Sequence, residues 1–134
     1  MILVDTSAWV EHLRATGSAI DEWLHAAIVS DASLLTTGVV TMELLAGARD
    51  DLHADRLRRF LARWPAIPVD EPSDFEVAAA IYRECRRSGR TVRRLPDCLI
   101  AAIALRSGAR LLHRDADYDA IAEVVPLRVV TVDG

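Results

Sequence analysis

Short apolar runs alternate along the chain with longer segments in which apolar residues recur every three or four positions. Runs of the first kind are typical of strands buried on both faces, and the second pattern is typical of amphipathic helices. Alternating strands and helices define an α/β fold, so we expect residues 1–134 to form one domain with a mainly parallel sheet of four to five strands flanked by helices. Strands are predicted at 2–4, 34–37, 110–113 and 127–132, with at best a short strand at 67–69. Helices are predicted at 7–14, 18–28, 39–48, 51–64, 73–87 and 97–106, with one or two helical turns at 115–123.

Two of these helices have distinctive patterns. The helix at 73–87 is predicted to be capped by Ser73 and to carry an apolar stripe that includes Phe75. The helix at 97–106 is apolar almost all round, which is typical of a buried central helix, and Gly108 ends it.

Composition is that of an ordinary globular protein. The chain has 134 residues, of which 51% are hydrophobic and 27% charged, enough for a core of normal size. A net charge of −4 argues against a protein that coats nucleic acid with its whole surface, but it is compatible with a local basic patch. Cys85 and Cys98 have no metal-type partners nearby in the sequence, so free thiols in a reducing cytosol are expected. No signal peptide precedes the first strand and no apolar run reaches the roughly 18 residues of a membrane span, so we expect a cytoplasmic protein without membrane contact.

Acidic residues follow the predicted strands at the ends where open α/β sheets place their ligands. One acid ends the first strand, two follow the strand at 110–113, one heads the buried helix, and one lies in the helix after the second strand. Each connection directs its acid toward the same edge of the sheet, so we expect the five carboxylates to converge. They are Asp5, Glu43, Asp97, Asp115 and Asp117.

Each acid also has a purely structural explanation. Asp97 is a favoured helix cap, and Asp115 and Asp117 are ordinary turn residues. Glu43 is harder to explain in this way, because apolar residues surround it in its helix and an unpaired buried glutamate is costly. The coincidence of all five favours a site.

The chemistry of such a cluster is narrow. Carboxylates packed together repel, so some of them must take up protons or bind a cation. A pocket lined by oxygen suits Mg²⁺ or Mn²⁺, whereas zinc prefers nitrogen and sulfur ligands. Sites of this kind typically hydrolyse phosphate esters with an activated water.

Four stretches, taken in order, resemble the PIN-domain nucleases. The short length and the acid spacing are most similar to the VapC-type toxins of bacterial toxin–antitoxin pairs. The resemblance covers the whole chain and implies a PIN-like single domain with a twisted, mainly parallel sheet between helices. The stretches are Ile2-Leu3-Val4-Asp5-Thr6-Ser7, Met42-Glu43-Leu44-Leu45-Ala46-Gly47, Asp97 at the head of an apolar helix, and Asp115-Ala116-Asp117-Tyr118.

The resemblance also implies an activity, partners and a role for each acid. It implies an endoribonuclease that uses one or two Mg²⁺ or Mn²⁺ ions to hydrolyse phosphodiester bonds of RNA, with a structured RNA such as tRNA as the expected substrate. It further implies a homodimer and a cognate antitoxin protein that blocks the acidic site, often with an arginine. The implied metal-site residues are Asp5, Asp97 and Asp115; Glu43 would complete the catalytic set, with support from Thr6, Ser7 and Asp117.

The chain departs from the family at one position. Many relatives have Thr or Ser two residues before the third core aspartate, whereas this chain has His113 before Asp115. A hydroxyl that would orient the site is therefore missing. We expect His113 to be a strand-end residue that points elsewhere, with contact to the substrate or the site as the alternative.

The segment 83–94, which leads to Asp97, is rich in arginine and contains a single acidic residue, Glu84. Arginine forks suit phosphate oxygens, and phosphate contacts position a nucleic acid without reading its sequence. We expect this segment to guide RNA, with a solvated helix face as the alternative. The predicted RNA contacts are Arg86, Arg87, Arg90, Arg93 and Arg94.

Apolar residues of the predicted N-terminal helices have two interpretations. Trp9, Trp23 and Trp64 are expected in or beside the core. They, or Leu13 and Leu24, are also candidates for a groove that receives an antitoxin segment.

Two other classes of protein place acids on a similar sheet. Receiver-type phospho-acceptor domains and haloacid-type phosphatases use a lysine at the sheet edge, and all 16 basic residues here are arginine, which counts against both. A catalytically inactive PIN-fold module that binds RNA or protein stays open as the alternative, although the retained acids argue against it.

Overall fold

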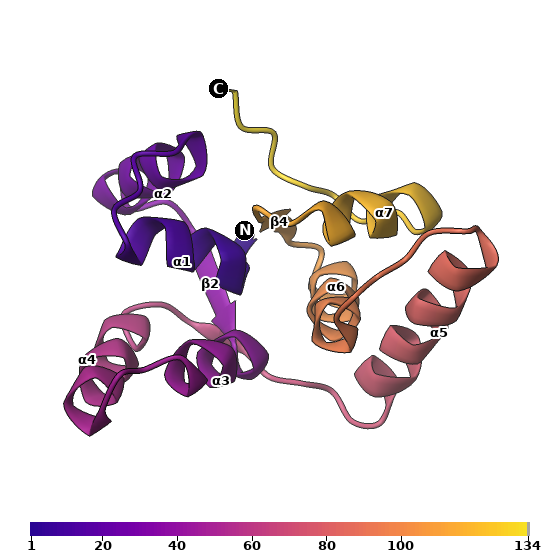
Figure 1. Cartoon of the computed structure of the whole chain (residues 1–134), viewed down its shortest axis with the longest axis horizontal. Coiled ribbons are helices and arrows are strands. Elements are labelled where there is room, and N and C mark those ends of the chain that lie inside the picture. Colours follow the sequence, from indigo (N-terminus) through magenta and orange to yellow (C-terminus); the bar gives the residue numbers. More distant parts are fainter. Residues whose placement is uncertain (134) are drawn as a thin grey trace.

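The computed structural model describes residues 1–133 and shows an α/β domain built on a four-stranded sheet (Figure 1). Every neighbouring pair of strands is parallel. This arrangement confirms the predicted fold class. In sheet order the strands are β3 (Ala66–Ile67), β2 (Leu34–Thr37), β1 (Ile2–Val4) and β4 (Arg110–Leu112).

The first strand, β1, lies inside the sheet because both of its edges are paired. Leu3 lies opposite Leu35 of β2 and Leu111 of β4, and it has no exposed surface. An uninterrupted apolar run is what such a position requires, since both faces are covered. The carboxyl end of β1 therefore delivers Asp5 to the sheet edge between two neighbouring strands.

Helices cover the sheet as the alternating pattern predicts. In Figure 1 the helices of the C-terminal half lie to the right of β2, whereas those of the N-terminal half lie to its left or overlap it. No helix of residues 1–133 is both long enough and apolar enough to cross a bilayer. The helices are α1 (Thr6–Leu13), α2 (Ala19–Val29), α3 (Gly38–Ala46), α4 (Asp51–Leu61), α5 (Ser73–Arg87), α6 (Leu95–Ser107) and α7 (Ala116–Val124).

The central helix, α6, begins two residues before the predicted start. Pro96 fits the first turn because no intrahelical partner is needed there for its missing N–H. Asp97 consequently lies inside the first turn and is not the cap, so the purely structural explanation of this acid is wrong. The helix ends at Gly108, whose φ of 72° lies in the left-handed region that glycine tolerates.

The predicted strand at 127–132 is reduced to one bridge between Leu111 and Val129. Leu111 uses both of its backbone groups there: it donates to the Arg128 carbonyl and accepts from Val130 N–H. The backbone groups of the other β4 residues point toward β1, where Leu112 O accepts from Asp5 N–H. Because β4 has only three residues, Leu111 alone directs its backbone groups to the outer edge. One residue is too few to pair with a further strand.

The start of α5 also differs from the prediction. Pro72 occupies the N-cap position and Ser73 is the first helical residue, with its hydroxyl donating to Asp70. Buried Asp74 instead accepts from Asp70 N–H and pairs with Arg106 of α6 at 2.9 Å. Phe75, expected in the apolar stripe that packs inward, is 47% exposed.

The predicted free thiols are confirmed, because Cys85 and Cys98 are both buried and unpaired by disulfide. Trp9 and Leu24 are fully buried, so neither can line a groove for a partner. Trp23 and Trp64 are partly buried and pack against the core.

Candidate functional site

Two of the predicted site acids are N-caps of helices that directly follow sheet strands. Asp5 caps α1, where Oδ2 accepts from Ser7 N–H at 2.9 Å and from the Ser7 hydroxyl at 2.5 Å. Asp115 caps α7 in the same way, because Oδ1 accepts from Asp117 N–H at 2.9 Å. Since β1 and β4 are parallel neighbours, both caps lie at the same edge of the sheet.

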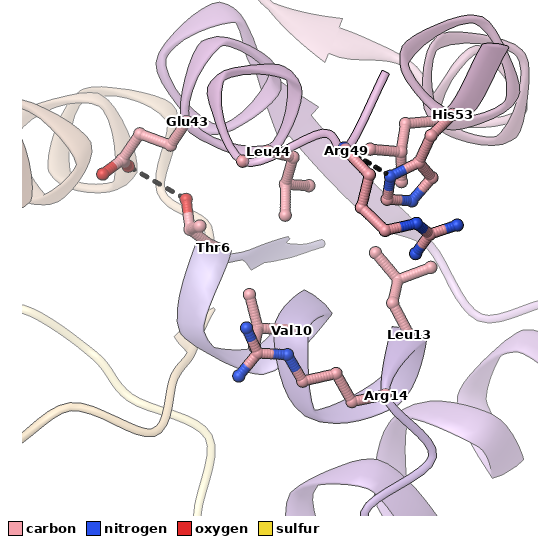
Figure 2. A pocket seen from close by; sticks show the side chains of 10 residues that line it. Thr6, Val10, Leu13, Arg14, Glu43, Leu44, Arg49 and His53 are labelled. Carbon is pink, nitrogen blue, oxygen red and sulfur yellow. Dashed lines mark hydrogen bonds between the residues drawn. The ribbon is translucent and has the colours of Figure 1, made fainter. Parts of the chain in front are cut away.

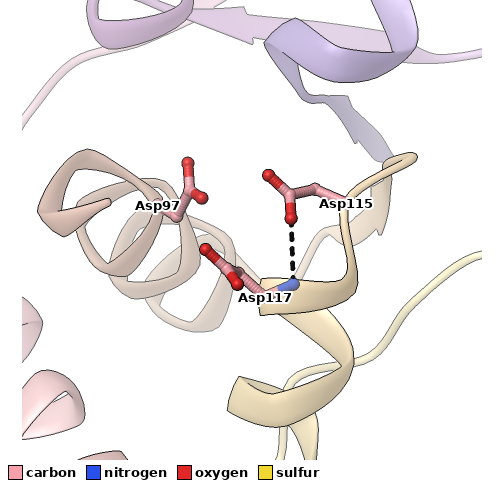
Figure 3. A group of neighbouring side chains, drawn as sticks. All are labelled: Asp97, Asp115 and Asp117. Carbon is pink, nitrogen blue, oxygen red and sulfur yellow. Dashed lines mark hydrogen bonds between the residues drawn. The ribbon is translucent and has the colours of Figure 1, made fainter. Parts of the chain in front are cut away.

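Three acids form a compact group, shown in Figure 3. Asp97 comes from the first turn of α6, and Asp115 and Asp117 come from the start of α7. One carboxylate oxygen of each lies within 4.8 Å of the others. Sequence reasoning gave Asp117 only a supporting part, whereas the structure places it in this group because the cap folds it back toward Asp115.

Asp97 is the acid of the site whose pKa is most clearly changed by its surroundings. Its side chain is almost wholly buried, and Oδ2 has no hydrogen-bond partner in residues 1–133. Burial raises the pKa of Asp97 from 3.8 to about 7, and the charges of Asp5 and Asp115 push it the same way, against the opposing effect of Arg94. Loss of water and like-charge crowding both disfavour the ionised carboxyl.

Glu43 reaches the site from α3, the helix after β2. Its Oε1 accepts from the Thr6 hydroxyl at 2.9 Å, which joins α3 to the first turn of α1. Its side chain is 9% exposed and pairs with Arg94. The Ser7 hydroxyl donates to Asp5 and accepts from Arg114 N–H at 2.8 Å, so it links α1 to the segment after β4.

Two of the predicted RNA-contacting arginines touch the acids themselves. Arg94 pairs with Glu43, and Arg93 lies 3.3 Å from Asp115 and 3.4 Å from Asp117. Both guanidinium groups remain largely exposed. Of the others, Arg90 pairs with Glu123 and Arg87 with Glu84, and the Arg86 guanidinium lies 5.9 Å from the ring centre of Tyr82.

His113 contacts the site, contrary to the expectation that it points elsewhere. Its Nδ1 accepts from Asp115 N–H at 3.1 Å, and its ring lies 5.0 Å from that of Tyr118. Burial lowers its pKa, which favours the neutral ring, and the nearby acids oppose that shift. The histidine thus holds the start of α7 through its hydrogen bond with Asp115 N–H.

Sequence reasoning missed Tyr118, whose hydroxyl donates to Asp5 Oδ1 at 2.6 Å and lies 3.4 Å from Asp97 Oδ1. One signal was available. Tyr118 lies three residues after the cap Asp115, and that spacing places two residues on the same side of a helix.

The residues present fit a divalent cation. The group consists of hard oxygen donors only, one oxygen of Asp97 is buried without a partner, and crowding makes the ionised form of that carboxyl unfavourable. A cation would give the unpartnered oxygen a ligand contact and would offset the crowded negative charge, and Mg²⁺ and Mn²⁺ prefer oxygen donors.

A groove of about 400 Å³ starts at Thr6 and Glu43 and runs between α1, α3 and α4. Figure 2 shows Val10, Leu13 and Leu44 on its walls, with arginines on its rim. Leu13 therefore lines a surface groove. The other apolar residues that were candidates for an antitoxin-binding groove are not among the residues that line it. The remaining lining residues are Arg14, Gly47, Arg49, His53 and Leu57.

Comparison with known proteins agrees with this geometry. Residues 2–124 match the PIN domain family. VapC ribonuclease Mb1587 of Mycobacterium bovis is 46% identical over 132 residues, which cover 98% of each chain. Ribonuclease VapC32 of Mycobacterium tuberculosis is 34% identical over 117 residues, covering 86% of this chain and 85% of that one. A crystal structure of VapBC2 from Rickettsia felis bound to a promoter DNA fragment matches with a TM-score of 0.76 at 18% identity, covering 99% of this chain and all of that one. The structure of Mycobacterium tuberculosis VapC20 matches with a TM-score of 0.64 at 21% identity, over 96% and 99% of the two chains.

A parallel sheet with carboxylates gathered at the ends of its strands is the architecture of the PIN domain, and the chain belongs to the PIN-domain family. Within that family it is a member of the VapC group.

Proposed function

We propose that this protein is a Mg²⁺- or Mn²⁺-dependent endoribonuclease toxin that hydrolyses phosphodiester bonds of RNA. The observation that carries the proposal is that acids from four separate segments, Asp5, Glu43, Asp97 and Asp115, lie close enough for the other three to raise the pKa of Asp97, whose Oδ2 has no hydrogen-bond partner in residues 1–133. The VapC ribonucleases that align over nearly the whole chain support the same reaction.

The catalytic set that we propose is Asp5, Glu43, Asp97 and Asp115, with one or two ions held by Asp97, Asp115 and Asp5. Thr6 orients Glu43 and Ser7 orients Asp5 through the hydrogen bonds described above. A bound divalent cation supplies positive charge that polarises a phosphate oxygen and lowers the pKa of water. The protein's own part is to hold the carboxylates and to exclude competing water from Asp97.

The substrate is RNA that approaches over the basic segment beside the acids. Arg93 and Arg94 pair with the site acids through guanidinium groups that stay accessible, so both can turn to a phosphate once a cation neutralises the carboxylates. Arg86 and Arg87 in the last turn of α5, and Arg90 just after that helix, extend the positive surface. We propose a structured RNA such as tRNA; the structural neighbour VapC20 of Mycobacterium tuberculosis is a toxin that cleaves the sarcin-ricin loop.

The partner that we propose is a cognate antitoxin, because the solved neighbours include VapBC toxin–antitoxin complexes. The groove of Figure 2 suits a protein segment, because apolar side chains on its walls alternate with charged and polar ones, and one end opens at Glu43. An antitoxin arginine that reaches Glu43 would compete with Arg94.

A homodimer is the second association that we propose. Met42, Phe75 and Leu95 are 58%, 47% and 57% exposed, and together with their neighbours they line an apolar pocket of about 270 Å³ between α3, α5 and α6. Exposed apolar side chains grouped in this way mark protein contacts. With RNA as its substrate, the protein would act in the cytoplasm.

The test is cleavage of tRNA and total RNA by purified protein in Mg²⁺ or Mn²⁺, with EDTA and an Asp97→Asn variant as negative controls. Asp55→Asn, which changes an exposed acid of α4, is the matched control and should cleave like wild type. RNA that is bound but not cut, with or without metal, would establish the inactive binding module instead.

A further inference from the structure

A tyrosine hydroxyl lies inside the acid cluster and belongs to none of the roles assigned so far. Tyr118 is in the first turn of α7 and has no exposed surface. Its hydroxyl oxygen is 2.6 Å from Asp5 Oδ1 and 3.4 Å from Asp97 Oδ1. The hydroxyl therefore lies between Asp5, which is 113 positions earlier in the chain, and Asp97, which is 21 positions earlier.

The ring of Tyr118 has little freedom to move. It is fully buried and packs against the His113 ring with 5.0 Å between centroids. A hydroxyl has one proton, and the shorter distance assigns that proton to Asp5. The second carboxylate, Asp97, is held at a longer distance from the same oxygen.

Asp5 is consequently fixed through both of its oxygens. Oδ1 accepts from Tyr118, and Oδ2 accepts from the Ser7 amide and hydroxyl. Asp97 is the opposite case, because its Oδ2 has no partner in residues 1–133. One carboxylate is oriented in advance while its neighbour keeps an oxygen available to a ligand.

We propose that Tyr118 is a positioning residue that orients Asp5 and sets its spacing from Asp97, so that the pair accepts a divalent cation without rearrangement. The inference rests on the proposed function, since it concerns how that site binds its metal. Hydrogen-bond partners behind metal ligands contribute about 10- to 100-fold to metal affinity or activity. Loss of the Tyr118 hydroxyl should weaken cation binding by a factor in this range.

The experiment compares Tyr118→Phe with Tyr82→Phe. Both substitutions remove one phenolic oxygen, but Tyr82 lies on α5 beside Arg86, and within residues 1–133 its hydroxyl makes no hydrogen bond to the site acids. Each purified protein is titrated with Mn²⁺ and with Mg²⁺ while thermal unfolding is recorded, which measures cation binding without any turnover. RNA cleavage is then measured at low and at saturating metal.

We expect Tyr118→Phe to require at least about tenfold more cation for the same rise in melting temperature, with Tyr82→Phe matching wild type. Cleavage should fall at low metal and recover toward wild type at saturating metal, with an unchanged KM for RNA.

Equal metal titrations for Tyr118→Phe and wild type would overturn the inference. So would a Tyr118→Phe protein that is unfolded at every metal concentration, because the hydroxyl would then serve the core and not the site. If metal does not raise the melting temperature of the wild-type protein and the protein does not cut RNA, the proposed function itself is wrong. The two failures can therefore be told apart.

Discussion

Asp97→Asn should make the metal-free protein more stable than wild type above neutral pH, although it removes a proposed catalytic acid. The carboxyl is 3% exposed, and its pKa rises from 3.8 to about 7 in the folded protein. A raised pKa in an acid means that the folded state binds the proton more tightly than the unfolded state. The stabilisation from this proton is complete below pH ~4 and is lost as the pH rises through ~7.

The magnitude follows from the size of the shift. About three pKa units correspond to about 4 kcal/mol of unfolding free energy between the acidic and the basic limit. Most of that range is crossed between pH 5 and pH 8, where wild type should lose about 2.5 kcal/mol relative to the Asn variant. Asparagine keeps the shape of the side chain but carries no charge near Asp5 and Asp115.

The assay is urea unfolding of both proteins in EDTA at several pH values from 5 to 8. Acids far from Asp97 contribute equally to both proteins; Asp74, whose pKa is lowered against the effect of burial by its hydrogen bond with Arg106, is one of them. The difference between wild type and variant therefore reports on Asp97 together with the neighbouring acids that it repels. Parallel stability curves over this range would refute the idea that burial and crowding destabilise the ionised carboxyl.

Three further predictions follow from other parts of the molecule. Arg90→Ala combined with Arg93→Ala should weaken RNA binding and flatten its dependence on salt, measured by fluorescence anisotropy; an unchanged salt slope would remove the basic segment from the account. Phe75→Asp should convert a dimer to a monomer in light scattering without changing the fold, and a dimer that survives would place the interface elsewhere. Ile103→Ala, at a fully buried position of α6, should lower the unfolding free energy by about 2–5 kcal/mol in urea titrations, whereas a cost below ~1 kcal/mol would show a loosely packed core.

Local sequence patterns predict an element well when the pattern itself indicates how the element is buried. The apolar run Ile2–Val4 is the inner strand, and the helix that is apolar all round is buried α6. The failures occur where a distant partner decides. The segment at 127–132 has a strand-like pattern, but only Leu111 of β4 has free backbone groups on that edge.

The site divides in the same way. Sequence reasoning could name the acids, because an acid at the end of a buried strand, as Asp5 is, or within an apolar helix, as Glu43 and Asp97 are, stands out locally. It could not show that Arg94 pairs with Glu43, since these residues are 51 positions apart and two flexible side chains meet there. Nor could it separate Asp97, which has a free oxygen, from Asp5, whose oxygens are both occupied.

The sequence by itself determined most of the strands and helices, and that acids follow the strands at 2–4 and 110–113, because these properties depend on neighbours within a few residues. Only the tertiary structure decided that Tyr118 stands between two carboxylates, that Asp117 joins the compact group, and that one oxygen of Asp97 has no partner within residues 1–133. Hydrogen bonding and desolvation depend on atoms brought together by packing, so they are settled when distant segments meet and cannot be read from the order of residues.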